Sequence, residues 1–344
     1  MSDIRFETAG RAGIVTLNRP EALNALTEAM AEALGEALAE WARDDRVERV
    51  AVRAEGKAFC AGGDIRDIYE RRAGAIDFFA TEYRTNHAIA TFPKPYVALI
   101  GGVCMGGGVG VSVHGDVRVA SPGIVFAMPE VSIGLFPDVG ASHLLSRMEG
   151  EAGMWLALTG TRLGRDEAAA VGFVTHPVDD GGLEEALDRI VEARDLDRVL
   201  ADLVVRTEPL EPERAAMVAD AFAADSVEEV QDRLAATETE AASKAASAIA
   251  RVSPTSLAVT HRQVRQARTS SVAEVLRTDF RIVSRILDGH DFYEGIRASV
   301  IDKDRAPRWD PATLAAVDEA DVAAHFAPGP HGDLPLTEAR SDVA

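Results

Sequence analysis

The alternation of apolar and polar residues near the N-terminus predicts a β-hairpin followed by a helix. Residues 4–8 and 14–17 alternate between apolar and polar side chains on either side of a glycine-containing turn, which is typical of two paired strands. From Leu26 to Trp41 the apolar residues recur at helical spacing, and Thr27 stands where an N-cap is expected. The chain therefore begins as a mixed α/β structure.

A strand, a glycine-rich loop and a helix then follow one another twice. The first copy runs from an apolar strand at 50–54 to glycines 62–63, and residues 65 to about 91 follow with helical spacing. The second copy runs from an apolar strand at 96–100 to the triple glycine 106–108, which a short helix and another strand follow. Two such loops can bring two backbone N–H groups close together.

The second half of the chain is predominantly helical. The predicted helical segments are 154–172, 181–250 and a long helix opened by Ser253-Pro254-Thr255, whereas 290–309 is mixed and Pro, Gly and Ser dominate after Phe326. These changes predict an α/β chain in three parts. They are a core over 1–180, a helical C-terminal region over 181–326 and a loose tail over 327–344.

The composition narrows the class of protein. The chain has 344 residues, 47% of them hydrophobic, and a formal net charge of −20. This is ordinary for a soluble globular protein, but it lacks the basic face that nucleic acids and anionic membranes require. No window reaches the length of a membrane span, and the first residues resemble neither a signal peptide nor a transit peptide. We therefore expect a cytosolic protein without nucleic-acid or membrane partners.

Neither the cysteines nor the histidines indicate a metal site. The two cysteines are Cys60 and Cys104, and two thiols without a histidine cluster make a poor zinc site. Two small packed residues are their more ordinary interpretation. The eight histidines follow neither H-x-H nor H-E-x-x-H spacing. No metal is implied.

Residues 101–140 carry the strongest indication of chemistry. The triple glycine 106–108 lies upstream of two carboxylates, Glu130 and Asp138, in an otherwise apolar segment. Glycine lets another molecule approach the backbone and leaves N–H groups free to face it. Carboxylates near such N–H groups suggest chemistry on a carbonyl whose oxygen becomes negative.

Other glycine-loop chemistries fit this segment poorly. The dinucleotide fingerprint G-x-G-x-x-G fails, because from Gly108 and Gly110 its third glycine falls on Val113. No G-x-x-x-x-G-K-[ST] occurs, and no G-x-S-x-G elbow surrounds Ser112. Tight packing at a strand–helix turn is the structural alternative for these glycines.

Glu130 and Asp138 lie in MPEVSIGLFPDVG, where a proline precedes each acid. Two loop carboxylates on the surface, in position to cap a helix, are one interpretation. The other is burial, which the flanking apolar residues favour: Phe126, Met128, Ile133, Leu135 and Phe136. Burial raises the pKa of a carboxyl group, and two nearby acids titrate as a pair. Such a pair can act as nucleophile or base with an orienting partner.

Several motifs together resemble the crotonase (enoyl-CoA hydratase/isomerase) superfamily. They are NRPEALNAL, GKAFCAGGDI, KPYVALIGGVCMGGGVG and MPEVSIGLFPDVG, over about residues 5–180. The segments GGGVGVSVHGDVRVA, FAMPEVSIGLFPDVG, LALTGTRL, SPTSLAVT and GHDFYEGIRASVIDKDRAPRW are most similar to the 3-hydroxyisobutyryl-CoA hydrolase branch. The resemblance therefore covers nearly the whole chain.

The resemblance implies a spiral of ββα units followed by helices, and an acyl-CoA thioester as substrate. It assigns the two oxyanion-binding N–H groups to Gly63 and Gly107, the catalytic acid to Glu130 and the second acid to Asp138. A further ligand-contacting acid is Glu82. It implies no cofactor beyond the coenzyme A of the substrate, and a homo-oligomer, trimeric or hexameric as is usual in the superfamily.

One departure favours hydrolysis over hydration. Hydratases carry a glutamate three residues after the middle glycine of GGG, and that position is Gly110 here, whereas Asp138 stands where hydratases typically have glycine. The predicted reaction is hydrolysis of 3-hydroxyisobutyryl-CoA, a step of valine catabolism. An enoyl-CoA hydratase or isomerase and a non-catalytic acyl-CoA-binding protein are the alternatives. Lys57 and Lys94 are the nearest candidates for contacts with the phosphates, although solvated surface lysines are their more ordinary interpretation.

Overall fold

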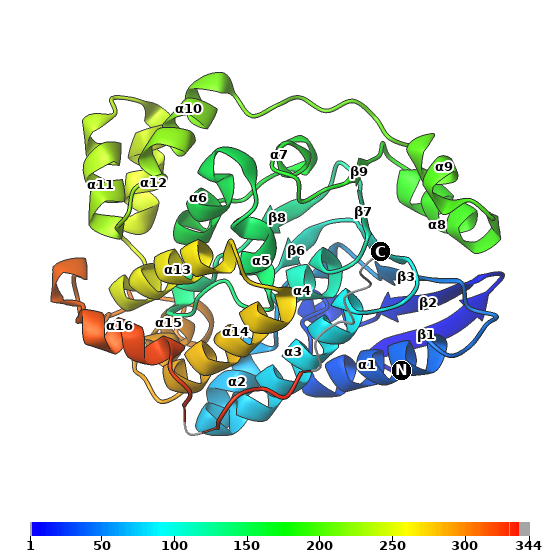
Figure 1. Ribbon diagram of the computed structural model, residues 1–344, viewed down its shortest axis with the longest axis horizontal. Helices are drawn as coiled ribbons and strands as arrows, with labels where there is room; N and C mark the ends of the chain where they lie inside the picture. The colour runs from blue at the N-terminus through cyan, green and yellow to red at the C-terminus, as the bar shows by residue number, and fades with distance from the viewer. Residues whose placement is uncertain (1, 330, 337–344) are drawn as a thin grey trace.

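The computed structural model of the protein describes residues 2–329 and 331–336. Its centre is a six-stranded sheet in the order β1-β2-β3-β5-β7-β9 (Figure 1). The strands are β1 (Ile4–Ala9), β2 (Ala12–Leu17), β3 (Arg49–Ala54), β5 (Tyr96–Ile100), β7 (Val117–Ala120) and β9 (His176–Pro177). β1 and β2 pair antiparallel, which confirms the predicted hairpin, and the other neighbours in this sheet are parallel.

A second, smaller sheet consists of strands that the sequence pattern did not reveal. β4 (Ala58–Cys60), β6 (Val103–Met105) and β8 (Val125–Ala127) pair in parallel. Each has only three residues, so its apolar run is too short to be distinguished from a loop. The chain enters the two sheets in turn, β3 then β4, β5 then β6, β7 then β8. This alternation is the spiral that the resemblance implies.

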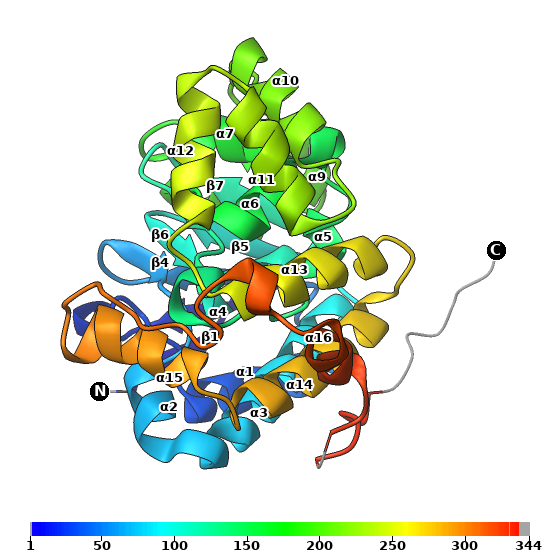
Figure 2. The same cartoon turned by 90° about the vertical axis from the view of Figure 1, so that its left-hand side faces the viewer.

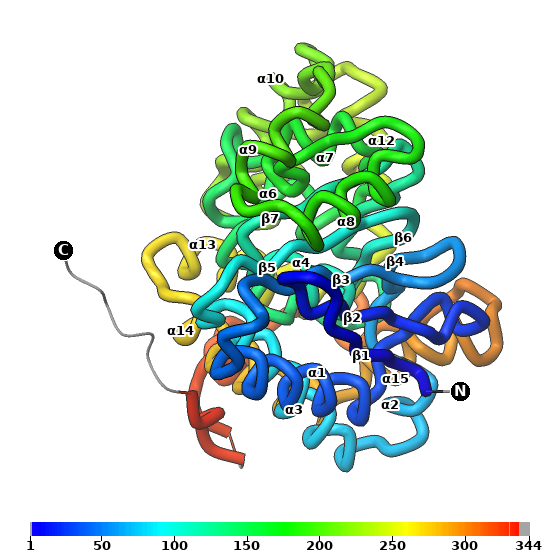
Figure 3. Tube along the Cα trace, turned by 90° about the vertical axis from the view of Figure 1, so that its right-hand side faces the viewer, coloured from blue at the N-terminus to red at the C-terminus, as the bar shows by residue number. Residues whose placement is uncertain are grey.

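The larger sheet is covered on both faces. Alternate residues of a strand point to opposite faces, and the central strands are apolar on both. Val50 and Val52 of β3 face the main core, whereas Ala51 between them packs in a separate cluster with α8 (Gly182–Glu192) and α9 (Leu196–Ala201). Figure 3 shows α8 and α9 on one side of the sheet and α1 (Glu28–Trp41) and α3 (Ile76–Ala90) on the other.

The predicted helix starts are accurate, and the predicted helix lengths are not. Thr27 caps α1 by accepting a hydrogen bond from Met30 N at 3.2 Å. The helix predicted over 65–91 is divided into α2 (Ile65–Arg71), a 3₁₀ turn and α3, because Arg72 has a φ of +55°. A φ of this sign is incompatible with a right-handed helix.

The remaining helices follow the predicted order with additional breaks. They are α4 (Gly107–Val113), α5 (Ala141–Leu145), α6 (Ala152–Thr159), α7 (Arg165–Ala170), α10 (Pro212–Ala221), α11 (Val227–Ala236), α12 (Glu240–Ile249), α13 (Pro254–Ala267), α14 (Val272–Ile286), α15 (Asp291–Ile296) and α16 (Glu319–Phe326). A π-helical turn, Arg297–Ile301, follows α15 directly. Among the described residues, no helix combines the length and the apolar character needed to cross a bilayer.

The C-terminal helices pack onto the predicted core instead of standing apart from it. α13 lies against α5 and α6, and α14 lies against α3 (Figures 1 and 2). One continuous hydrophobic cluster contains residues from both regions. The parts predicted as 1–180 and 181–326 therefore share a core, although α10, α11 and α12 form a group of their own at one end (Figure 2).

Part of the segment predicted as a loose tail is held against α14. Leu334 is buried, and the Arg281 side chain pairs with Asp333 at 2.5 Å. Arg277 donates a hydrogen bond to Leu336 O at 2.6 Å. The prediction for 327–344 is therefore wrong for these residues, because arginines of α14 bind them. Residues 330 and 337–344 lie outside the described residues.

Candidate active site

One cleft brings all the predicted site residues together. Its volume is about 660 Å³. Gly63, Glu82, Gly107, Glu130 and Asp138 all line it. They come from the loop after β4, from α3, from the start of α4, from the turn after β8 and from the loop before α5. The spiral fold is what places these five segments around one space.

In the loop after β4, the N–H of Gly63 points away from Leu26, the residue paired with this loop. Leu26 N donates to Gly62 O at 2.8 Å, and Leu26 O accepts from Asp64 N at 2.9 Å. This pattern is a parallel bridge opposite Gly63. In such a pairing Gly63 does not bond Leu26, and its N–H points away from Leu26. That N–H faces the start of α4.

Gly107 is the first residue of α4, where helical N–H groups have no partner within the helix. A Cβ added to Gly107 would lie 3.3 Å from Gly63 N. The two glycine loops are therefore adjacent, as the repeated strand–loop–helix pattern predicted. The same Cβ would lie 2.5 Å from Glu82 Oε1, so a side chain at this position would displace the Glu82 carboxyl group.

Glu130 has a carboxylate oxygen that is left unsatisfied. The residue follows Pro129 and opens a 3₁₀ turn, Glu130–Ile133. It is 5% exposed, and its Oε2 has no hydrogen-bond partner among the described residues. Burial, and secondarily the charge of Asp138, raises the pKa of Glu130 well above its usual value. The carboxylate form of such a group is a stronger base than an exposed glutamate.

Asp138 is also buried, but it has a partner. Tyr83 of α3 donates its hydroxyl to Asp138 Oδ2 at 2.7 Å. Burial raises the pKa of Asp138 to about 6, and the hydrogen bond from Tyr83 opposes that shift. Because Tyr83 occupies Oδ2 and Asp138 lines the cleft, Oδ1 is the oxygen that can accept a hydrogen bond from a group that enters the cleft.

Glu82 shares the cleft with these two acids. It is 2% exposed, and its Oε1 has no partner among the described side chains and backbone groups. Burial, followed by the charges of Asp138 and Glu130, raises its pKa well above the usual value. Three carboxyl groups in one cleft cannot all be ionised without a large electrostatic cost, so their protonation states are coupled.

The position that carries a glutamate in hydratases is closed in this chain. A Cβ on Gly110 would lie 2.8 Å from both Asn86 Nδ2 and Val139 Cβ. Asn86 lies on α3 one turn beyond Glu82, and it is 1% exposed. Sequence reasoning found the glycine but missed Asn86, because nothing in the local sequence of α3 indicates which residues face α4.

The basic residues at the cleft differ from those suggested by the sequence. Lys94 is not available to a ligand phosphate, because its Nζ donates to the backbone oxygens of Trp41, Asp44 and Val47 at 2.5–2.9 Å. Lys57 does not line the cleft, whereas Arg66 and Lys303 do. Lys303 lies in the C-terminal segment that carries the resemblance to the hydrolase branch. That resemblance was the feature of the sequence that could have indicated Lys303 as a cleft residue.

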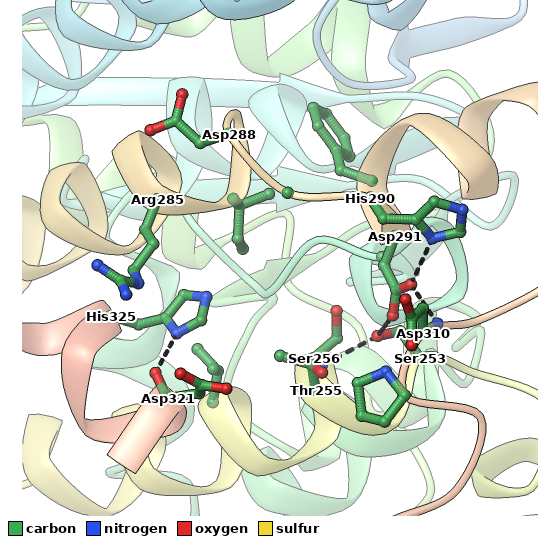
Figure 4. A pocket seen from close by; sticks show the side chains of 16 residues that line it. Ser253, Thr255, Ser256, Arg285, Asp288, His290, Asp291, Asp310, Asp321 and His325 are labelled. Carbon is green, nitrogen blue, oxygen red and sulfur yellow. Dashed lines mark hydrogen bonds and ion pairs between the residues drawn. The ribbon is translucent and has the colours of Figure 1, made fainter. Parts of the chain in front are cut away.

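A second cavity, of about 460 Å³, is lined by Gly134, which ends the Glu130–Ile133 turn, and by residues of α13, α14, α15 and α16 (Figure 4). Ser253 there caps α13 and donates its hydroxyl to Asp291 Oδ2 at 2.6 Å, while Asp310 N donates to Asp291 Oδ1 at 2.8 Å. Ser253 N also donates to Val131 O at 3.3 Å. The C-terminal segments are thus bonded to the turn that carries Glu130. Within the described ranges, no group of three or more His, Cys, Asp or Glu side chains could hold a metal ion.

Known proteins of similar sequence are thioester hydrolases by name. A "3-hydroxyisobutyryl-CoA hydrolase, mitochondrial" of Danio rerio is 43% identical, with 97% of this chain and 92% of that protein covered. The protein of the same name from Homo sapiens is 39% identical, with 94% of this chain and 88% of that protein covered. These two names contradict the prediction of a cytosolic protein. That prediction rested on the sequence of residues 1–13 and on the lack of a membrane-length apolar window.

Solved structures confirm the predicted fold. A carnitinyl-CoA dehydratase from Mycobacterium thermoresistibile superposes with a TM-score of 0.91 at 39% identity, covering 96% of this chain and 98% of that one. An enoyl-CoA hydratase from Rhodobacter sphaeroides 2.4.1 superposes with a TM-score of 0.88 at 39% identity, covering 97% and 100%. A family model described as enoyl-CoA hydratase/isomerase matches residues 12–326. With its fold, its cleft and its relatives in agreement, the chain belongs to the enoyl-CoA hydratase/isomerase family.

Proposed function

We propose that the protein hydrolyses the thioester of a short-chain 3-hydroxyacyl-CoA, 3-hydroxyisobutyryl-CoA, to free coenzyme A and the 3-hydroxy acid. By family resemblance this reaction is a step of valine catabolism. One observation carries the proposal. Two backbone N–H groups, at Gly63 and Gly107, meet at a cleft that also holds the unsatisfied carboxylate of Glu130. The names of the hydrolase relatives support the same reaction.

In the proposed mechanism the thioester oxygen lies between the N–H groups of Gly63 and Gly107. Attack on the carbonyl carbon converts that oxygen to an oxyanion, which these two donors stabilise. Glu130 either attacks the carbon itself, giving a mixed anhydride that water then cleaves, or takes a proton from the attacking water. In both routes the C–S bond breaks, the thiolate of coenzyme A gains a proton, and water supplies the new oxygen of the acid.

Asp138 is proposed to select the acyl group. Its Oδ2 already accepts from Tyr83, so Oδ1 is the oxygen offered to a hydroxyl on the third carbon of the acyl chain. An acid in this apolar cleft is better satisfied by a substrate that brings a donor. Glu82 of α3 is proposed as a further contact with the ligand, since it lines the cleft and its Oε1 has no partner within the described chain.

Hydration of an enoyl-CoA is the second candidate, since similar solved structures carry the names of a hydratase and a dehydratase. Adding water across a double bond needs a second carboxylate, and the position that hydratases use for it is Gly110, which Asn86 and Val139 enclose. The test is to supply 3-hydroxyisobutyryl-CoA and crotonyl-CoA to the same preparation and to follow free thiol and enone absorbance. Thiol release from the first substrate supports hydrolysis, whereas loss of enone absorbance without thiol release supports hydration.

A further inference from the structure

The loop that carries Asp138 has an unfavourable backbone conformation. Val139 has a φ of +55°, and Gly140 follows with a φ of +74°. A β-branched residue seldom adopts this left-handed conformation, which persists only where the surroundings impose it. Some part of the fold must therefore hold loop 137–140 in place.

His114 at the end of α4 bonds the strained residue itself, with its Nε2 2.7 Å from Val139 O, and the bonds at the two ends of the loop come from the C-terminal helices α13 and α14. Asp279 of α14 accepts a hydrogen bond from Gly140 N at 2.8 Å through Oδ2. Its other oxygen, Oδ1, accepts from Gln263 Nε2 of α13 at 2.6 Å. Gln263 Nε2 also donates to Pro137 O at 3.1 Å. The loop is thus bound at both ends, at Pro137 and at Gly140.

Asp279 has no place in the cleft itself. It is 0% exposed, and it does not line the cleft that holds Asp138 and Glu130. A buried carboxylate without a cation beside it is costly unless donors satisfy it. Here both oxygens are satisfied by donors that fix the same loop, which indicates that the residue serves the loop.

We infer that Asp279, together with Gln263, is a positioning residue for Asp138 and so sets the acyl selectivity of the enzyme. The inference rests on the proposed function of Asp138. A hydrogen bond to a substrate hydroxyl requires the acceptor within a narrow range of distance and angle, and a loop released from Pro137 and Gly140 loses that geometry. The C-terminal helices then contribute to specificity, although they supply neither oxyanion glycine nor Glu130.

The test compares Asp279→Ala with Ser284→Ala. Ser284 is equally buried on the same helix, but its hydroxyl donates to Phe280 O within α14 at 2.6 Å, so its loss affects stability without touching the loop. The measured quantity is the ratio of kcat/KM for 3-hydroxyisobutyryl-CoA to that for isobutyryl-CoA. Loss of one positioned hydrogen bond predicts that Asp279→Ala lowers this ratio by about fivefold to tenfold, while Ser284→Ala leaves it unchanged.

A second variant covers the case in which Asp279→Ala does not fold. Asp279→Asn keeps the volume but replaces one carboxylate oxygen by an NH2 donor, so it no longer offers an acceptor at both positions to which Gly140 N and Gln263 Nε2 donate. We expect a smaller fall in the ratio than for alanine. A folded Asp279 variant with the wild-type ratio overturns the inference, even if its melting temperature falls.

A crystal structure of the same variant separates this inference from the proposed function. We expect the backbone of residues 137–140 to adopt a different conformation in the Asp279 variant and to keep its conformation in Ser284→Ala. If the wild type releases no thiol from either substrate, the proposed function fails. The position of the loop in the two variants then still decides whether Asp279 holds it.

Discussion

The two carboxylates proposed to act in the cleft are held in opposite ways. Glu130 lies on a short 3₁₀ turn, and its Oε2 has no partner among the described residues. Asp138 accepts a hydrogen bond from Tyr83, and its loop is bound to α13 and α14. The group proposed to react has one oxygen without a partner in the described chain and a raised pKa. The group proposed to select the substrate is fixed by hydrogen bonds.

The largest effect is expected when the unsatisfied carboxylate is removed. Glu130→Gln keeps the volume but cannot attack a carbonyl or accept a proton from water. We expect kcat to fall by about 10²–10⁴-fold, the usual value of acid–base catalysis, with a smaller change in KM. Thiol release under saturating substrate measures it. A kcat within about tenfold of wild type means that Glu130 is not the catalytic group.

A matched pair of variants tests whether the backbone N–H of Gly107 donates to the oxyanion that the reaction at Glu130 would produce. Gly107→Pro and Gly107→Ala both add a Cβ that meets Glu82 Oε1, but only proline removes the N–H. Proline is well tolerated at the first position of a helix, so the fold of α4 should survive. We expect the proline variant to be slower than the alanine variant by about 10²–10³-fold. Equal rates for two folded variants would refute the donor role.

The coupling between the two carboxylates predicts a shift in pH dependence. The charge of Asp138 is the second cause, after burial, of the raised pKa of Glu130. Asp138→Asn removes a neighbouring negative charge, which stabilises the Glu130 carboxylate and lowers its pKa. The acidic limb of log kcat/KM for isobutyryl-CoA should therefore move to lower pH. A limb that stays in place or moves to higher pH would show that the charge of Asp138 does not act on Glu130.

The smallest expected effect is a change in thermal stability when Glu82, the third acid of the cleft, is replaced. The pKa of Glu82 is raised by burial and by Asp138 and Glu130. When the pKa of an acid is higher in the folded than in the unfolded protein, the free energy of unfolding is largest below the unfolded-state pKa. It falls as the pH rises from the unfolded-state pKa through the folded-state pKa. Glu82→Gln should therefore raise Tm by roughly 2–4 °C at pH 8 and by less at pH 5. Thermal unfolding at both pH values checks this, and a variant less stable at pH 8 contradicts it.

Local sequence features predicted the structural elements that depend on short-range physics. Thr27 and Ser253 cap their helices as expected, because the cap and its N–H donor lie within one turn. The repeated glycine loops indicated that two backbone N–H groups could come together, and the resemblance to the crotonase superfamily assigned these groups to Gly63 and Gly107. The three-residue strands of the smaller sheet were missed, because their stability comes from pairing with distant segments and not from their own pattern.

The support of the Asp138 loop could not be read from the sequence. Gly140 and Asp279 are 139 positions apart, and Pro137 and Gln263 are 126 apart. A buried aspartate and glutamine on helices look like ordinary polar positions until the fold brings them to the loop. Lys94 was misread for the same reason, because the three backbone oxygens that bind it belong to the end of α1 and the turn after it.

The measurement that tests the account most directly is the selectivity of the wild type for a hydroxylated acyl group. We predict a kcat/KM at least about tenfold higher for 3-hydroxyisobutyryl-CoA than for isobutyryl-CoA, because only the first brings a donor to Asp138 Oδ1. Asp138→Ala should narrow the ratio by lowering kcat/KM mainly for the hydroxylated substrate. Equal kcat/KM for the two substrates in the wild type, or an unchanged ratio in the variant, would contradict the role given to Asp138 and favour the hydratase alternative.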